Sequence, residues 1–115
     1  WSKRFFERTG RMPGMIQAGT YSAVLHYLRA VGDAKTTDAD AVAAAMKSRP
    51  VDDFFAPGAK IREDGRLMND LFLFEVKKPS ESKGEWDLWK VGTRLPAAEI
   101  IAPLSESTCN FVRGR

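Results

Sequence analysis

The apolar residues of this chain change their spacing at Pro50, and this change most constrains the fold. Before Pro50 they recur at the spacing of amphipathic helices, and after it they alternate or cluster as in β-strands. About three helices followed by several strands predict part of an α/β protein rather than a closed βαβ unit. The predicted helices cover residues 1–8, 16–31 and 38–48. The predicted strands cover residues 51–55, 71–76 and 86–91, and a hairpin is predicted over 60–68. A short helical turn is predicted over 96–101 and a tail from 105.

The second predicted helix has the clearest apolar stripe. The stripe residues share i, i+3, i+4, i+7 spacing and are predicted to be buried: Tyr21, Val24, Leu25, Leu28 and Val31. Gly32 and Asp33 are expected to end this helix. In the third helix, Thr37 is the predicted N-cap and Asp40 the predicted capping-box acid. That helix should close before Pro50, because the residue preceding a proline disfavours helical backbone.

Two features predict strands after Pro50. The pair Asp64-Gly65 is typical of a tight hairpin turn. Leu71–Val76 is the strongest predicted strand, and its apolar residues on both faces predict that both faces are covered. We expect Trp86 and Trp89 to pack in a core rather than to form an exposed stacking platform.

The charge pattern argues against a nucleic-acid partner. The net charge is +3 and the isoelectric point about 9.2, but basic and acidic residues are interspersed along the 115-residue chain. Nucleic-acid binding usually needs basic side chains gathered on one face. A small basic interaction or nucleic-acid-binding domain is therefore only a second hypothesis. Trp1 is not preceded by a methionine, and the residues from Trp1 onward have the pattern of a helix interior. We therefore expect this chain to be a piece of a longer protein.

Residues suited to catalysis or metal binding are sparse. His26 is the only histidine and Cys109 the only cysteine, which together cannot complete a zinc site. We expect His26 to be a packed or surface helix residue. Asp52 and Asp53 are adjacent, so in a strand their carboxylates would point to opposite faces. The sequence therefore predicts a protein that is not an enzyme, with no cofactor and no metal.

A series of motifs, taken in order, resembles one protein family. An aromatic helix leads into a Gly-x-x-Pro loop and then a helix that opens with a small residue and Tyr-x-Ala. The motifs lie in Phe5–Pro13, Gln17–Val24, Ile61–Arg66, Leu73–Lys77, Pro79–Asp87 and Ser107–Cys109. Together they resemble the C-terminal part of branched-chain amino acid-type periplasmic substrate-binding proteins of ABC transporters, which have the type I periplasmic-binding-protein fold. The order of the motifs, rather than any single one, carries the resemblance.

This resemblance implies a two-lobed protein whose lobes are joined by a hinge of three crossing strands and close over a ligand. The ligand is expected to be a branched-chain amino acid or a related small carboxylate, and the membrane permease of an importer is the expected partner. The expected compartment is the periplasm. Residues 1–50 would belong to one lobe, 51–104 would supply strands and a hinge crossing, and 105–115 a tail. A ligand-sensing receptor domain of the same fold is the alternative.

One segment of the implied cleft lies within this chain. In the family, the stretch before the Tyr-x-Ala helix lines the cleft, and here that stretch is Met15, Ile16 and Gln17. A helix N-terminus offers backbone N–H groups to an anion, and Gln17 adds a side-chain amide. The other interpretation is that Met15 and Ile16 pack while Gln17 is solvated. Tyr21 is a further candidate, although a core role is favoured for it. No charged residue lies in this segment, so we expect charge recognition to come from outside the chain.

Overall fold

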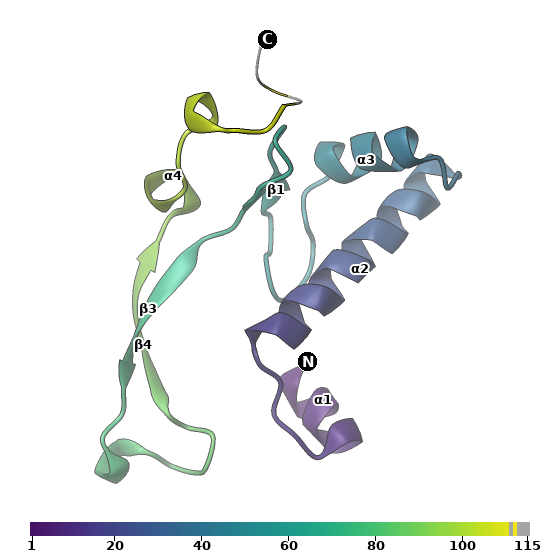
Figure 1. Ribbon diagram of the computed structural model, residues 1–115. Helices are drawn as coiled ribbons and strands as arrows, with labels where there is room; N and C mark the ends of the chain where they lie inside the picture. The colour runs from purple at the N-terminus through teal and green to yellow at the C-terminus, as the bar shows by residue number, and fades with distance from the viewer. Residues whose placement is uncertain (111, 113–115) are drawn as a thin grey trace.

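The computed structural model describes residues 1–110 and 112 of the chain. Three helices come first, and two β-hairpins and short helical turns follow (Figure 1). In chain order the elements are α1 (Ser2–Thr9), α2 (Met15–Ala34), α3 (Ala39–Ser48), β1 (Lys60–Ile61), β2 (Leu67–Met68), β3 (Leu71–Val76), the 3-10 turn η1 (Pro79–Glu81), β4 (Trp89–Leu95), α4 (Ala97–Ile100) and the 3-10 turn η2 (Leu104–Glu106). This order confirms the predicted α/β class. Residues 111 and 113–115 of the predicted tail lie outside the described residues.

Helices α2 and α3 pack through small and polar residues. The buried residues of α2 are Ser22, His26 and Ala30, which follow one another at i, i+4, i+8, and α3 contributes Val42. His26 Nε2 lies 2.9 Å from the Met46 carbonyl oxygen, so a side chain of α2 bonds the backbone of α3. His26 was expected to be a packed or a surface helix residue, and the structure shows the packed one.

The predicted apolar stripe of α2 does not form this interface. Tyr21, Val24 and Leu28 are exposed, while Leu25 and Val31 are half-buried. The prediction that these residues are buried is therefore wrong for this chain. The buried row of α2 is instead Ser22, His26 and Ala30, from which His26 reaches the α3 backbone. An apolar face of α2 is left without cover.

The helix ends differ from the predictions in detail. Helix α2 continues past the predicted stop and ends at Ala34, and its C-cap Lys35 has left-handed backbone with φ 52°. The N-cap of α3 is Asp38 rather than Thr37, since Asp38 Oδ1 accepts the Ala41 N–H at 2.9 Å. A carboxylate accepts this bond more strongly than a hydroxyl and also complements the helix dipole. Asp40 lies in the first turn but is not the capping acid.

The segment after α3 is an irregular loop, so the strand predicted over residues 51–55 is wrong. Asp53 Oδ1 accepts the backbone N–H groups of Phe55 and Ala56, at 2.9 and 3.0 Å, and turns the chain. Burial raises the pKa of Asp53, but hydrogen bonds from Ser22 and from these two amides outweigh burial and lower it. The loop encloses the small apolar cluster of Val51, Ala56 and Ala59.

The hairpin of β1 and β2 confirms the predicted Asp64-Gly65 turn. Gly65 has φ 83°, a conformation that side chains disfavour. Arg62 donates to both Asp64 carboxylate oxygens, at 2.9 and 2.8 Å, and to the Ala102 carbonyl oxygen at 2.8 Å. These bonds hold the pKa of Asp64 well below its usual range. The Arg62 bond to Ala102 thereby connects the segment after α4 to the β1–β2 hairpin.

Strands β3 and β4 form a long antiparallel hairpin that stands apart from the helices (Figure 1). The predicted strand over 71–76 is confirmed, whereas the one predicted over 86–91 begins later, at Trp89. All six residues of β3 are exposed, so the prediction that both its faces are covered is wrong for this chain. Trp86 and Trp89 are also exposed, which contradicts the expected core role. A two-stranded hairpin cannot cover its own faces.

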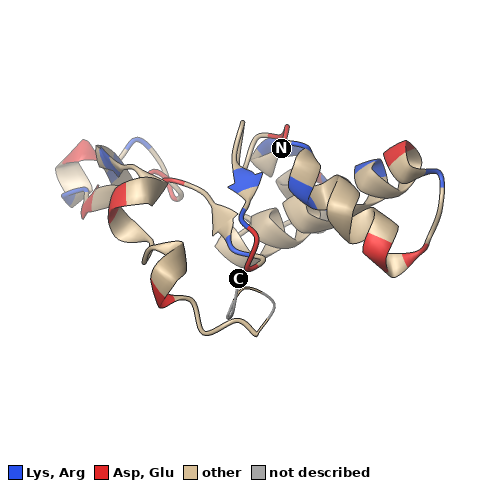
Figure 2. Ribbon diagram, turned by 90° about the horizontal axis from the view of Figure 1, so that it is seen from above, with Lys and Arg blue, Asp and Glu red and all other residues tan. Residues whose placement is uncertain are grey.

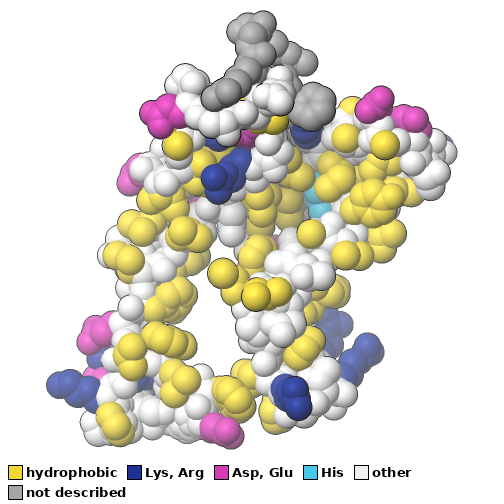
Figure 3. Space-filling model, in the orientation of Figure 1, with side chains coloured by type: hydrophobic (Ala, Val, Ile, Leu, Met, Phe, Trp, Pro, Cys, Tyr) yellow, Lys and Arg dark blue, Asp and Glu magenta, His cyan; other side chains and the backbone are white. Residues whose placement is uncertain are grey.

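The chain as a whole is open rather than compact. Its radius of gyration is 17.5 Å and its extents are 54 × 34 × 19 Å, whereas a compact domain of this length has a radius of gyration of about 13 Å. Figure 3 shows the molecule hollowed between the hairpin and the helices, with hydrophobic side chains along both sides. Among the described residues, the buried apolar side chains are all alanines and valines. Much of the apolar surface of this chain is thus left uncovered by the described residues.

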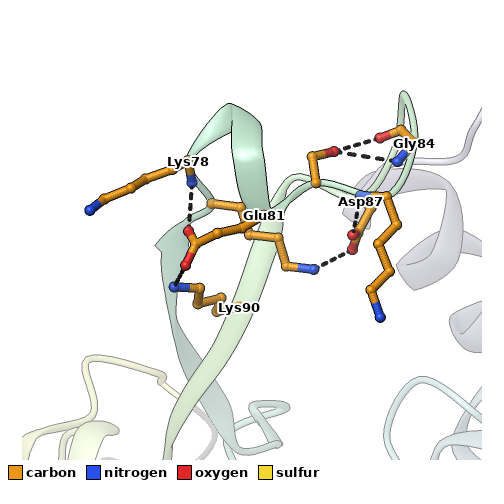
Figure 4. Close-up of polar contacts among 8 residues, drawn as sticks. Lys78, Glu81, Gly84, Asp87 and Lys90 are labelled. Carbon is orange, nitrogen blue, oxygen red and sulfur yellow. Dashed lines mark hydrogen bonds and ion pairs between the residues drawn. The ribbon is translucent and has the colours of Figure 1, made fainter.

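Two ion pairs, with a backbone hydrogen bond beside each, hold the connection between β3 and β4, and we call this set of contacts the polar frame (Figure 4). The Lys77 ammonium lies 2.6 Å from Asp87 Oδ1, and the Lys83 N–H donates to Asp87 Oδ2 at 2.9 Å. The Lys90 ammonium lies 2.6 Å from Glu81 Oε1, and the Lys78 N–H donates to Glu81 Oε2 at 2.8 Å. Each carboxylate thus joins one ammonium to one backbone amide.

The frame should be sensitive to acid. The Lys77 and Lys83 bonds lower the pKa of Asp87, and those from Lys90 and Lys78 lower the pKa of Glu81. A lowered folded-state pKa means that the stabilisation is fully present above about pH 5, where the unfolded carboxyls are ionised, and is lost as the pH falls through the lowered value. Carboxyl-carbon NMR titration should give both pKa values below their ordinary ones. Lys77→Met should raise the pKa of Asp87 more than that of Glu81, and equal responses would contradict this pairing.

Candidate functional site

The first turn of α2 is held by its own capping interaction. The Gly14 N–H donates to Gln17 Oε1 at 3.0 Å, so the Gln17 side chain folds back over the helix start. Met15 and Ile16 are 75% and 78% exposed. Neither residue packs within this chain, so the interpretation of the pair as packed residues fails here. The N-terminal amides of α2 have no acceptor within the helix, and two apolar side chains flank them.

A hollow of about 540 Å³ lies between α1 and the start of α2. Its volume falls within the range of small-molecule sites. The residues that line it come from both helices: Trp1, Arg4, Phe5, Arg8, Ile16, Gln17, Thr20 and Tyr21. The structure therefore brings together three of the four candidate residues, Ile16, Gln17 and Tyr21, and leaves Met15 outside the lining.

The aromatic side of the hollow is a cluster of rings from three parts of the chain. The Trp1 ring stacks on Phe54 with centroids 4.9 Å apart, and it contacts Phe5 and Tyr21 at 5.3 and 5.6 Å. Tyr21 is 42% exposed, so the core role favoured for it is wrong. Its ring instead forms part of the wall. Tilted and stacked ring pairs at these distances hold one another in place, which makes the wall a preformed surface.

The positive side of the hollow consists of two arginines that the sequence interpretation missed. Arg4 and Arg8 are one helical turn apart on α1 and are both exposed. Basic side chains gather over this helix in Figure 3. The expectation that charge recognition comes from outside the chain stays a prediction, but these two arginines lie beside the segment for which it was made. Their i, i+4 spacing, interleaved with Trp1 and Phe5, was the signal that could have identified them.

Other candidate groups do not assemble into a site. Among the described residues, no group of histidine, cysteine and acidic side chains could hold a metal ion. Figure 2 shows acidic and basic residues interspersed over both halves of the molecule rather than a basic face. None of the helices in the described part of the chain is both long enough and apolar enough to span a membrane.

Comparison with known proteins decides the family. A family model described as periplasmic binding protein matches residues 1–85, which is well over half of the chain. The chain belongs to the periplasmic binding protein family. Its members are binding proteins, in agreement with the arrangement of an open, preformed hollow. None of the curated proteins matches the chain.

Two crystal structures show how this periplasmic binding protein chain relates to its family. A periplasmic binding protein from Burkholderia mallei is 42% identical, with a TM-score of 0.91 over 96% of this chain. A branched chain amino acid ABC transporter periplasmic ligand-binding protein from Burkholderia xenovorans LB400 is 38% identical, with a TM-score of 0.91 over 97% of this chain. This chain covers 29% and 30% of those two chains. The fold is therefore a portion of the periplasmic-binding-protein fold, as the sequence predicted.

Proposed function

We propose that this chain is the C-terminal part of the solute-binding component of an ABC importer. The observation that carries the proposal is the 38% identity and 0.91 TM-score, over 97% of the chain, to a protein named as a branched chain amino acid ABC transporter periplasmic ligand-binding protein. The proposed ligand is a branched-chain amino acid or a related small carboxylate. The proposed compartment is the periplasm, and the proposed partner of the full-length protein is the membrane permease of the importer.

The open shape of the chain supports a two-lobed parent. Residues 1–50 would belong to one lobe, residues 51–104 would cross the hinge, and residues 105–115 would form a tail. The exposed faces of β3 and β4 and the uncovered apolar face of α2 suit contact with the remaining polypeptide. A hinge crossing needs an extended element that leaves one packed body, and the β3–β4 hairpin has this form (Figure 1).

The proposed ligand contacts within this chain are Met15, Ile16, Gln17 and Tyr21. Met15 and Ile16 present apolar side chains at the start of α2, and Gln17 already bonds Gly14 through its oxygen, which leaves its amide nitrogen to donate. Tyr21 adds a ring edge one turn further along. The N-terminal amides of α2 would favour a carboxylate.

A thermal-shift screen of the full-length protein tests the proposal. Amino acids and small organic acids are the ligands to be compared, with nucleotides as a control class. A ligand at 100 times its dissociation constant should stabilise the folded protein by about 2.7 kcal/mol, a readily measured shift in melting temperature. Stabilisation by a nucleotide and by none of the amino acids or acids would overturn the proposal.

A further inference from the structure

The lining of the hollow between α1 and α2 combines two chemistries. It contains the rings of Trp1, Phe5 and Tyr21 together with the guanidinium groups of Arg4 and Arg8. We propose that this hollow selects an aromatic carboxylate, with the ligand ring on the aromatic wall and its carboxylate on the two arginines. This inference rests on the proposed function, because it names the class of solute for the same site.

The arginines are available for a ligand. Within the described part of the chain, neither Arg4 nor Arg8 makes an ion pair or side-chain hydrogen bond, whereas Arg49, Arg62 and Arg94 each bond an acidic side chain. The residues that line the hollow include no aspartate or glutamate. A guanidinium group presents a planar fork of donors that matches a carboxylate. Two such groups one turn apart favour an anion.

The aromatic wall favours a flat, apolar ligand body. Trp1 contacts three other rings, Phe54 at a 17° interplanar angle and Phe5 and Tyr21 at tilted angles. Phe54 in turn contacts Tyr21 at 5.8 Å. Because these rings support one another, little side-chain entropy is lost when a ligand ring binds against them. Stacked or edge contacts with a ligand ring then add to the burial of apolar surface.

The polar groups of the hollow suit an acid better than a zwitterionic amino acid. An ammonium group needs acceptors, and the side chains of the lining offer the Thr20 and Tyr21 hydroxyls and Gln17 Oε1. Gln17 Oε1 already accepts the Gly14 N–H. Donors, by contrast, are plentiful in the two guanidinium groups and the first turn of α2. An aromatic acid without an α-ammonium group therefore meets complementary groups at both of its ends.

Calorimetric titration of the full-length protein with benzoate and with leucine tests the inference. Arg4→Gln and Arg8→Gln should each weaken benzoate binding by about tenfold or more, since each removes a charged hydrogen bond. Lys3→Gln is the matched control, because it removes one positive charge from the same helix at a residue outside the lining. It should change benzoate affinity by less than about twofold, the size expected for a screened surface charge.

The outcomes separate the two proposals. Benzoate binding that depends on Arg4 and Arg8 but not on Lys3 supports the inference. Leucine binding without benzoate binding, or benzoate binding that both arginine variants retain, overturns the inference and leaves the proposed solute-binding function standing. Binding of neither probe overturns the inference, and the wider thermal-shift screen then decides the proposed function. Circular dichroism of each variant should match the parent, because both arginines are exposed.

Discussion

On its own, the 115-residue chain should sediment as dimers or larger species at high concentration, rather than as a 12.8 kDa monomer. One face of the β3–β4 hairpin is apolar along its length. Its members alternate along the paired strands and are between 45% and 67% exposed: Phe72, Phe74, Val76, Trp89 and Val91. Contiguous apolar surface of this kind drives association, and the hairpin also has unpaired strand edges that another chain can occupy.

Charge placed on this face should restore the monomer. The double substitution Phe74→Lys with Trp89→Lys puts two ammonium groups into the aromatic contact between these residues, whose centroids are 6.4 Å apart. The matched control is Met15→Lys with Ile16→Lys, which adds the same charge at residues of even greater exposure outside the hairpin. Sedimentation velocity should show a monomer for the hairpin variant and associated species for the control. A monomeric parent chain would contradict the prediction.

Local signals predicted most of the secondary structure, because helix periodicity and turn chemistry act over a few residues. The hairpin turn at Asp64-Gly65 and the strand over 71–76 are set by such signals. The strand over 51–55 failed because Asp53 bonds the amides of Phe55 and Ala56. That interaction bends the backbone and outweighs the β-propensity of the flanking apolar residues.

Burial could not be predicted from the same patterns. An apolar stripe shows that a face needs cover but not which polypeptide supplies the cover. In α2 the stripe stays exposed, whereas Ser22, His26 and Ala30 are buried and His26 bonds the Met46 carbonyl of α3. The same difficulty applies to β3, whose apolar faces were expected to be covered. In both elements the described residues leave the apolar face uncovered, and the chain covers 29–30% of its solved relatives.

Only part of the candidate site could be predicted, because the rest depends on contacts between residues far apart in the sequence. Sequence reasoning identified the start of α2, because a helix N-terminus and the family resemblance point to the same segment. It did not predict that Arg4 and Arg8 lie beside that segment, because their position depends on how α1 lies against the start of α2. That approach is fixed by the Trp1 contacts with Tyr21 and Phe54, between residues far apart in the sequence.

Substitution of Ala30 by leucine should destabilise the full-length protein by about 1–3 kcal/mol. Ala30 is 0% exposed and lies in the row through which α2 packs on α3. A larger side chain there would push the helices apart and lengthen the contact between His26 and the Met46 carbonyl oxygen, now 2.9 Å. Ala44→Leu makes the same change at an exposed residue of α3 and should stay within about 0.5 kcal/mol of the parent. Urea denaturation of both variants measures the difference, and equal unfolding free energies would show that the α2–α3 contact is not closely packed.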